Sequence, residues 1–482
     1  MTKVRPPFYV ERIFVGKEFE HFLICPQKGE AEHRGGIPLA SRFSRSIPLN
    51  LPIVSANMDT VTGPEMCIAV AQEGGIGILP RSDKISIEQE ANWVREVKRA
   101  KSLVVEHPFT ILETQTVGEA RAEMAKRKVH TLLVENQKGE LAGMLTARRI
   151  DICQNDNALV EDWMKKRMGR GLAFSRKEVT SLQMAIDEMR GYEGETKLVL
   201  IDKHYRIKGL ITSKDIGELI RKPLANKDAK GRLRVGAAIG AVGDYLERAA
   251  ALIEAGADVI VIDIAHAHSV VMEKAIFNFK KKFSHELVGG NVATFEGARF
   301  LIEQGVDGIK VGLGSGSRCL TRRKTGVGVP QMHAIRAVWH AVQSEQSDIP
   351  IISDGGVREE GDINKALAVG ASSVMLGNFL AGTDEAPGEF IPNPVTRERK
   401  KSYRGMTSPQ AKIESVGSMK EVRNVEGREE EVPYKGSVKD IAKDTRDAIQ
   451  SMVSYAGALN LEETRKKLND NPLQYLIPLP LL

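Results

Sequence analysis

Between about Arg234 and Leu380 the sequence alternates short apolar runs with amphipathic stretches, and this pattern constrains the fold more than any other feature. The apolar runs are residues 235–239, 258–262, 308–311, 350–353 and 373–376. The intervening stretches include residues 245–254, 295–303 and 331–343. Short buried strands that alternate with amphipathic helices are typical of a parallel β-sheet covered on both faces. We therefore predict an α/β fold.

Polar or glycine-rich segments follow one predicted strand after another. They are Asp263, Asn291, Gly312 to Ser317, Asp354 to Gly356, and Gly377-Asn378. A doubly wound sheet would also show strands alternating with helices. Functional loops after successive strands are, however, typical of a (β/α)8 TIM barrel, whose active site lies at the carboxyl ends of the strands. Apolar runs at 53–57 and 75–79 continue the pattern toward the N-terminus. We predict a catalytic barrel formed by residues 1–101 and 223–482.

The region between these two parts, residues 102–222, contains an approximate internal repeat. One copy begins near Thr116 and the other near Thr180, and each reads as helix, strand, turn and strand, followed by a threonine at a helix start. Two copies are too few for a solenoid. They fit a paired module inserted in a barrel loop, because domains whose termini lie close together tolerate insertion.

Composition narrows the class of protein. The chain has 42% hydrophobic and 27% charged residues, which excludes an intrinsically disordered protein. We see no secretory signal, and no apolar run approaches the roughly 20 residues of a membrane span. The excess of 69 Lys+Arg over 63 Asp+Glu is small and scattered, and aromatic residues are only 5%, which argues against a nucleic-acid partner.

The four cysteines are widely spaced and form no CxxC pair, which argues against a zinc site or a disulfide framework. We therefore expect a reduced, cytoplasmic enzyme. Cys25, Cys67 and Cys153 have ordinary surroundings and are interpreted as structural. Cys319 differs, because it lies in a segment with five glycines, 311–328, between Arg318 and Arg322. Glycines let backbone N–H groups approach an anion, and nearby positive charge favours the nucleophilic thiolate.

Motifs along nearly the whole chain resemble those of the IMP dehydrogenase/GMP reductase family. They are residues 55–61, 72–77, 231–238 and 290–294, the Cys319 loop, and residues 354–356, 375–377, 403–406 and 433–436. The resemblance implies a TIM barrel, and the repeated insert looks like the family's tandem CBS (Bateman) regulatory domain. It also implies a homotetramer, or an octamer joined through the CBS modules.

The resemblance assigns roles to individual positions. Cys319 would attack C2 of a purine nucleotide. The substrate-binding positions would be Ser317, Asp354, Gly355, Gly356, Met375, Gly377, Asn378, Tyr403, Gly405 and Met406. The nicotinamide cofactor would contact Asp263, Ala265, His266, Gly290, Asn291 and Arg423. A K+ ion would bind backbone carbonyls of Gly314, Gly316 and Cys319, and ATP or GTP would bind the insert near Thr146, Asp151, Thr212 and Asp215.

Two reactions are open to a family member with this cysteine. IMP dehydrogenase passes hydride from IMP to NAD and hydrolyses the enzyme adduct to XMP with water activated by an Arg-Tyr pair in a flap. Residues 407–432 contain no tyrosine, although Arg423 could serve as a lone base. GMP reductase converts GMP to IMP and ammonia with NADPH, and a Thr-Glu pair handles the protons; Thr321 and Glu426 match that pair. We therefore predict a GMP reductase of purine salvage.

Three departures bear on this choice. Leu320 replaces the usual threonine after the cysteine and Ser315 replaces a proline, and both lie in the predicted potassium loop. Residues 263–268 are closer to the dehydrogenase version of their loop. A different class, a catalytically idle sensor of purine nucleotides, would be expected to lose the nucleophile, whereas Cys319 is present.

Overall fold

The computed structural model describes residues 10–82, 84–100, 103–167, 172–179, 182–192, 194–392, 398–409 and 425–479. The chain divides into two compact units. One comprises Met1–Lys98, Leu224–Asn226 and Leu233–Leu482, and we call it the barrel unit. The other comprises Arg99–Pro223 and Lys227–Arg232, and we call it the repeat unit.

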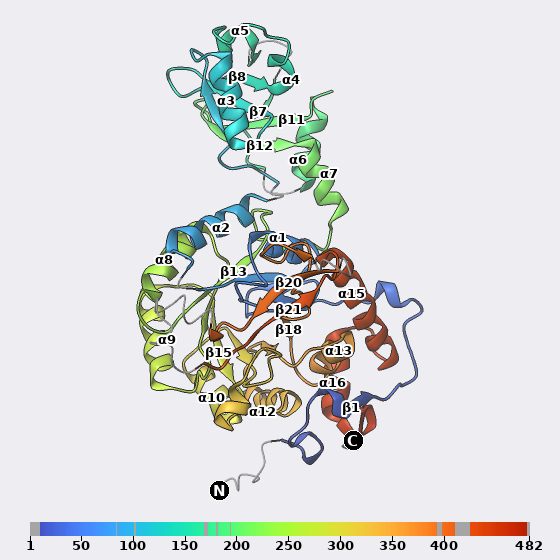
Figure 1. Cartoon of the computed structure of the whole chain (residues 1–482). Helices are drawn as coiled ribbons and strands as arrows, with labels where there is room; N and C mark the ends of the chain where they lie inside the picture. The colour runs from blue at the N-terminus through green and yellow to red at the C-terminus, as the bar shows by residue number, and fades with distance from the viewer. Residues whose placement is uncertain are drawn as a thin grey trace. The chain divides into compact units, whose positions relative to one another are not determined.

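The barrel unit contains a closed barrel of eight parallel strands among the described residues, which confirms the predicted TIM barrel (Figure 1). In order around the barrel these are β13 (Val235–Ile239), β14 (Val259–Asp263), β15 (Leu287–Val292), β16 (Gly308–Val311), β17 (Ile351–Asp354), β18 (Ser373–Leu376), β4 (Ile53–Ser55) and β5 (Ile76–Leu79). The barrel closes where β5 pairs with β13, with Gly77 opposite Val235.

Alternate side chains of the strands fill the inside of the barrel. Val259 and Val261 of β14 join Ile76 and Ile78 of β5 in one buried cluster. Successive residues of a strand point to opposite faces, so Ile260 between them faces the surrounding helices. Both sets are fully buried. This two-sided burial explains why the strands read as continuous apolar runs in the sequence.

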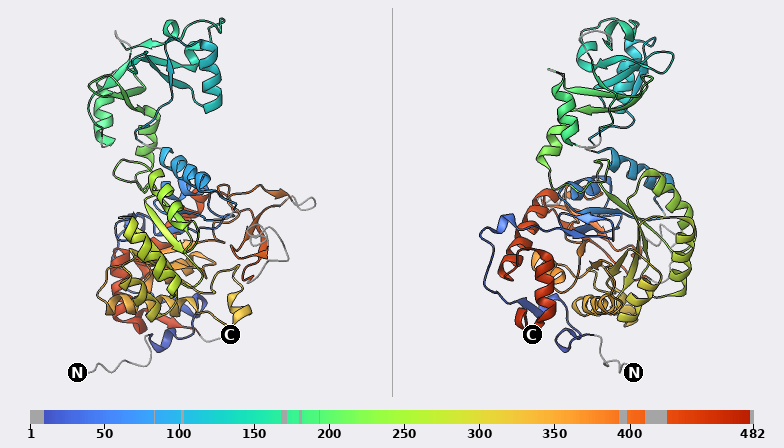
Figure 2. Two further views of the ribbon diagram at one scale, coloured as in Figure 1. Left: turned by 90° about the vertical axis from the view of Figure 1, so that its left-hand side faces the viewer. Right: turned by 180° about the vertical axis from the view of Figure 1, so that it is seen from behind.

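Helices surround the barrel strands (Figure 1). They are α1 (Pro64–Gln72), α2 (Ile87–Arg99), α8 (Tyr245–Ala255), α9 (Val270–Lys282), α10 (Phe295–Glu303), α12 (Gln331–Ser344) and α13 (Glu360–Ala368). The C-terminal helices α15 (Val438–Tyr455) and α16 (Leu461–Asp470), red in Figure 2, pack against α1 and α13 on one flank. The strand β1 (Phe22–Ile24) pairs with β22 (Leu476–Pro478), which joins the two ends of the unit.

The repeat unit contains two copies of one arrangement. The first has β6 (Thr110–Leu112), α3 (Val117–Arg127), β7 (Thr131–Glu135), β8 (Leu141–Thr146), α4 (Ala147–Ile150), α5 (Val160–Trp163) and β9 (Lys165–Lys166). The second has β10 (Ala173–Ser175), α6 (Leu182–Arg190), β11 (Lys197–Ile201), β12 (Ile207–Thr212) and α7 (Ser213–Arg221). In each copy the first strand pairs parallel with the second, which pairs antiparallel with the third.

Each copy has an apolar core of its own, and a further apolar cluster joins them, in which Leu133 and Met144 of the first copy pack with Val199 and Leu210 of the second. The two copies of the sequence repeat thus have the same strand pairing in the structure. That the repeat unit is a tandem CBS domain stays a prediction.

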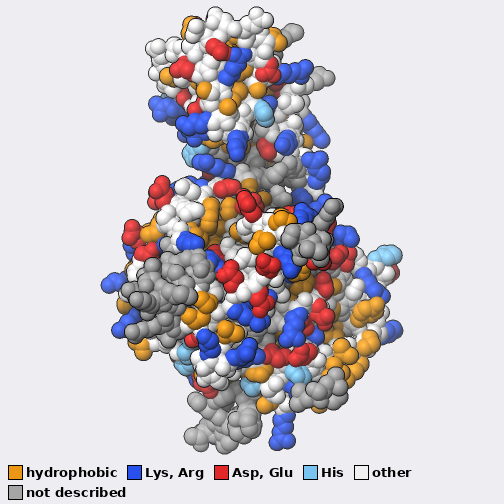
Figure 3. Space-filling model, in the orientation of Figure 1, with side chains coloured by type: hydrophobic (Ala, Val, Ile, Leu, Met, Phe, Trp, Pro, Cys, Tyr) orange, Lys and Arg blue, Asp and Glu red, His pale blue; other side chains and the backbone are white. Residues whose placement is uncertain are grey.

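The surface shows no single dominant charge on the face drawn in Figure 3, where acidic and basic side chains are intermixed over the barrel unit. Within the described ranges, no helix is both long and apolar enough to span a membrane.

Candidate active site

A cavity of about 220 Å³ lies where the loops that follow β4, β16, β17 and β18 converge. All ten positions predicted to bind substrate line it. They are Ser317, Asp354, Gly355, Gly356, Met375, Gly377, Asn378, Tyr403, Gly405 and Met406. Cys319 and Glu426 line it as well. This is the carboxyl end of the barrel, where enzymes of this architecture carry their active sites.

The predicted nucleophile is one end of a hydrogen-bonded chain. Cys319 is half-buried and lies two residues before the first residue of the short helix α11 (Thr321–Thr325). Its thiol donates to Thr321 Oγ1 over 3.1 Å, and the Thr321 hydroxyl donates to Glu426 Oε2 over 2.5 Å. The backbone holds this arrangement, because the Leu320 N–H donates to the Glu426 carbonyl over 2.6 Å. The three residues predicted to be catalytic are thus in direct contact.

The two arginines beside Cys319 bond elsewhere. The Arg318 guanidinium pairs with Glu430 and lies 5.0 Å from the centre of the Tyr403 ring. The Arg322 guanidinium pairs with Glu18. Both positive charges are therefore matched by carboxylates, and the hydrogen-bonded neighbour of the thiol is Thr321. That the flanking arginines favour the thiolate stays a prediction.

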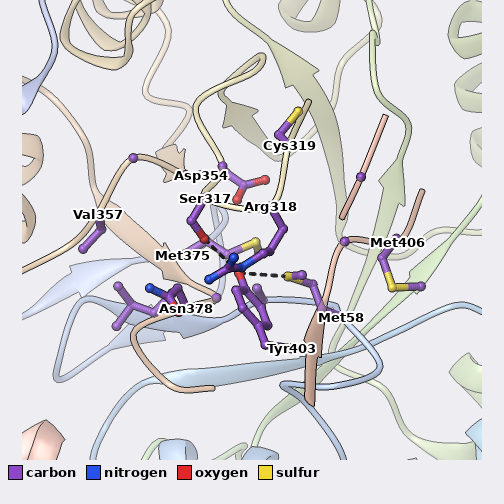
Figure 4. A pocket seen from close by; sticks show the side chains of 18 of the residues that line it. Met58, Ser317, Arg318, Cys319, Asp354, Val357, Met375, Asn378, Tyr403 and Met406 are labelled. Carbon is purple, nitrogen blue, oxygen red and sulfur yellow. Dashed lines mark hydrogen bonds between the residues drawn. The ribbon is translucent and has the colours of Figure 1, made fainter. Parts of the chain in front are cut away.

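The far end of the cavity has hydroxyl groups and glycine backbone. The Tyr403 hydroxyl lies 3.4 Å from Ser317 Oγ and 3.9 Å from the Met58 sulfur (Figure 4). Burial raises the pKa of Tyr403 above its ordinary value, so this hydroxyl stays a donor. A Cβ at Gly377 would come within 2.9 Å of the same hydroxyl, so only glycine leaves the space free. Such a surface can accept an anion such as a phosphate.

A cluster of charged and amide groups adjoins Asp354, the one member of the cluster that lines the cavity. Asp354 ends β17, Asp263 ends β14, and Lys310 of β16 lies between them, with its Nζ 2.6 Å from Asp354 Oδ2 and 3.1 Å from Asp263 Oδ1. Burial alone would lower the pKa of Lys310, but the two carboxylates raise it above its ordinary value. Asn291 donates to Asp354 Oδ2 over 2.9 Å, and Asn57 donates to Asp263 Oδ2 over 2.5 Å.

Several lining or neighbouring residues were not predicted. Besides Lys310 and Asn57, they are Ala56, Met58, Arg318, Val357, Leu376, Phe379, Thr407 and Gly427. The signal for Lys310 was present in the sequence, because a lysine in an otherwise apolar strand is rarely buried without a partner.

The positions predicted to bind the cofactor lie in different places in the structure. Asp263, Gly290 and Asn291 lie at the ends of β14 and β15. Ala265 and His266 follow β14 as exposed residues. None of these five lines the cavity described above. Arg423 lies outside the described residues, so the structure does not place it.

Two buried amide oxygens near the cavity have no hydrogen-bond partner in the described part of the chain. They are Asn291 Oδ1 and Asn378 Oδ1. Both oxygens can accept a hydrogen bond from water or from a bound molecule.

The predicted potassium loop borders a second cavity, of about 550 Å³, lined by Gly314, Ser315 and Gly316. The Gly316 carbonyl accepts the Cys319 N–H over 2.9 Å. In the described residues no group of three or more His, Cys, Asp or Glu side chains could hold a metal ion. A potassium ion would use carbonyls instead, and it stays a prediction.

In the repeat unit, the four predicted regulatory residues differ between the copies. Thr212 donates to Asp215 Oδ2 over 2.6 Å, and the Asp215 N–H donates back to Thr212 over 3.1 Å. Thr146 and Asp151, in contrast, stand at opposite ends of the one-turn helix α4. Only the second copy therefore brings its threonine and aspartate into contact.

A protein-family model described as IMP dehydrogenase / GMP reductase domain matches residues 16–471. The inosine-5′-monophosphate dehydrogenase of Nitrosopumilus maritimus is 42% identical over 461 residues, which is 94% of each chain. That of Aquifex aeolicus is 42% identical over 467 residues, covering 95% of this chain and 93% of the relative.

Among solved structures, two of the same enzyme resemble this chain. A cysteine-to-alanine variant of Trypanosoma brucei GMP reductase, in complex with guanosine 5′-monophosphate, matches with a TM-score of 0.88 and 35% identity over 97% of this chain and 96% of that one. The same enzyme in complex with guanosine 5′-triphosphate matches with a TM-score of 0.78 and 34% identity over 94% and 96%.

Proposed function

We propose that this chain, which belongs to the IMP dehydrogenase/GMP reductase family, is a GMP reductase. It would convert GMP and NADPH to IMP, ammonia and NADP. The observation that carries the proposal is the contact chain from Cys319 through Thr321 to Glu426 at the edge of the cavity. A carboxylate in contact with a nucleophile through one hydroxyl can take the thiol proton and return it to a departing amine.

The proton and bond changes balance without an external base. The Cys319 thiol proton passes through Thr321 to Glu426 as the sulfur bonds to C2 of GMP. Glu426 then returns that proton through Thr321 to the exocyclic amine, and the C2–N bond breaks to release ammonia. When C2 next gains a hydride, the C2–S bond breaks, IMP leaves and the thiolate takes a proton from solvent.

The cavity wall supports a nucleotide in this pose. Tyr403, Ser317 and the glycine backbone would bind the 5′-phosphate, and Asp354 would accept hydrogen bonds from the ribose hydroxyls. On the cofactor side, Asp263, Gly290 and Asn291 at the ends of β14 and β15 would contact the nicotinamide. NADPH, when bound, would supply the hydride for C2.

IMP dehydrogenase is the second candidate, because the relatives that match at 42% identity carry that name. It needs a base that activates water, and the flap segment that would supply one has no tyrosine. Two assays at 340 nm, the absorbance wavelength of reduced nicotinamide, separate the candidates. We expect GMP to consume NADPH and expect IMP to produce no NADH from NAD. Rapid XMP formation would establish the second candidate instead.

We further propose that the repeat unit is a tandem CBS domain that binds ATP or GTP and regulates the barrel. Replacing residues 102–222 by a short linker should leave turnover of GMP within about threefold of the intact enzyme, because the barrel has its own core. The response of that turnover to added ATP or GTP should be lost. Dose–response curves of both proteins test this, and identical responses would contradict regulation by the repeat unit.

The Thr212→Val variant tests the same proposal with a single substitution instead of a deletion. It removes the hydroxyl that contacts Asp215 and keeps the rest of the unit. It should weaken the nucleotide response without changing turnover in the absence of ATP and GTP. Sedimentation of the intact and deleted proteins tests the proposed homotetramer and its assembly into an octamer through the repeat unit.

A further inference from the structure

Lys310 is a buried lysine shared by two carboxylates. Its side chain is only 3% exposed, and its Nζ contacts both Asp354 and Asp263. Gly290 makes room for it, because a Cβ at that position would come within 2.5 Å of the Lys310 Cβ. Burying a charged group is costly unless its partners are well placed. The arrangement therefore holds all three charged groups in a fixed geometry.

The contacts orient the Asp354 carboxylate. Among the described residues, Lys310 and Asn291 both bond to Oδ2 of Asp354, at 2.6 and 2.9 Å, and no side chain bonds to Oδ1. Oδ1 is thus left to accept hydrogen bonds from a ligand. Asp263 is held at both oxygens, by Lys310 at Oδ1 and by Asn57 at Oδ2. Asp354 lines the cavity, whereas Asp263 does not.

We propose that Lys310 is a positioning residue that fixes Asp354 for the ribose hydroxyls of the purine nucleotide and couples it to Asp263 on the cofactor side. This inference rests on the nucleotide placement in the proposed function. An ammonium group shared by two carboxylates changes its contact with one when the other changes. A substitution at Asp263, which lies outside the nucleotide cavity, should therefore alter nucleotide binding, and only while Lys310 is present.

Titration calorimetry with GMP tests the coupling in the full-length protein. Lys310→Met should raise the Kd for GMP by about 10- to 100-fold, because it removes a charge-assisted hydrogen bond that orients Asp354. Lys310→Arg, which keeps the charge, should recover most of the affinity. Asp263→Asn should change the Kd at least about threefold in the wild-type background and less than about twofold in the Lys310→Met background, because the lysine carries the effect.

Lys98→Met is the matched control. Lys98 is also buried, 4% exposed, and its Nζ lies 2.6 Å from Asp258 Oδ2, immediately before β14 and therefore at the other end of the strand from Asp263. We expect it to lower the melting temperature without changing the Kd for GMP. If Lys310 were merely structural, Lys310→Met would behave in the same way, with a lower melting temperature and an unchanged Kd.

Two outcomes would overturn the inference. One is an unchanged Kd for GMP in Lys310→Met. The other is an unchanged Kd in Asp263→Asn, a measurement that decides the question even where Lys310→Met does not fold. IMP is titrated beside GMP, so a chain that binds only IMP would refute the reductase assignment, while the comparison of variants with IMP would still test Lys310.

Discussion

Cys319→Ala should lower the turnover of GMP with NADPH by at least about a thousandfold, because no covalent bond to C2 can form without the sulfur. The fold should persist. The thiol is half-buried, and among the described residues it makes one side-chain hydrogen bond, to Thr321. Loss of NADPH absorbance measures the rate, and the melting temperature reports the fold. Binding of GMP should remain, because Asp354 and Tyr403 are untouched.

Cys25→Ala provides the comparison, because Cys25 is also half-buried and its thiol makes one hydrogen bond within the described ranges, to the neighbouring Pro26 carbonyl at 3.9 Å. We expect full activity from it. Retention of more than about one-hundredth of the wild-type rate in Cys319→Ala would remove this cysteine from the mechanism, because loss of a covalent nucleophile typically costs far more.

Most barrel strands could be predicted because they are buried on both faces and read as apolar runs. The strand β15 was recognised only by its polar end. Its central residues are Gly289, Gly290 and Asn291, which have low strand propensity. The structure gives the reason for the glycines: a Cβ at Gly289 would come within 2.9 Å of Met272, and one at Gly290 would strike Lys310. Close packing thus requires glycine at these two positions, and glycine makes the strand hard to recognise from the sequence.

The site was predicted in part for a similar reason. Motifs fix the order of residues along the chain, and the barrel brings the loops after its strands to one end, so residues from four loops meet in one cavity. The partners of Arg318 and Arg322 could not be predicted in this way. Glu430 and Glu18 lie more than a hundred residues away, in segments without a strand-end signature. Charged residues that are adjacent in the sequence therefore do not reveal which charged groups they contact in the structure.

Glu426→Gln should lower kcat for GMP by about 10²- to 10⁴-fold, the usual contribution of a positioned general acid or base. The substitution keeps the size of the side chain, and its amide oxygen can still accept the Thr321 hydrogen bond of 2.5 Å. An amide cannot take up the thiol proton and deliver it to the departing amine, so the loss should fall on kcat. The Kd for GMP should stay within about threefold, as expected for an interaction made mainly in the transition state.

Glu431→Gln distinguishes this role from a general effect of flap charge. Glu431 lies close to Glu426 in the sequence. In the part of the chain that the structure describes, its carboxylate makes a long ion pair of 3.8 Å with Lys400, and its side chain is 50% exposed. Its replacement should change kcat by less than about threefold, because exposed ion pairs contribute little. Equal and small effects of the two substitutions would mean that Glu426 is a surface residue of the flap. The contact chain from Cys319 would then not carry the proton, and water activation by Arg423 in an IMP dehydrogenase would be the reaction to test next.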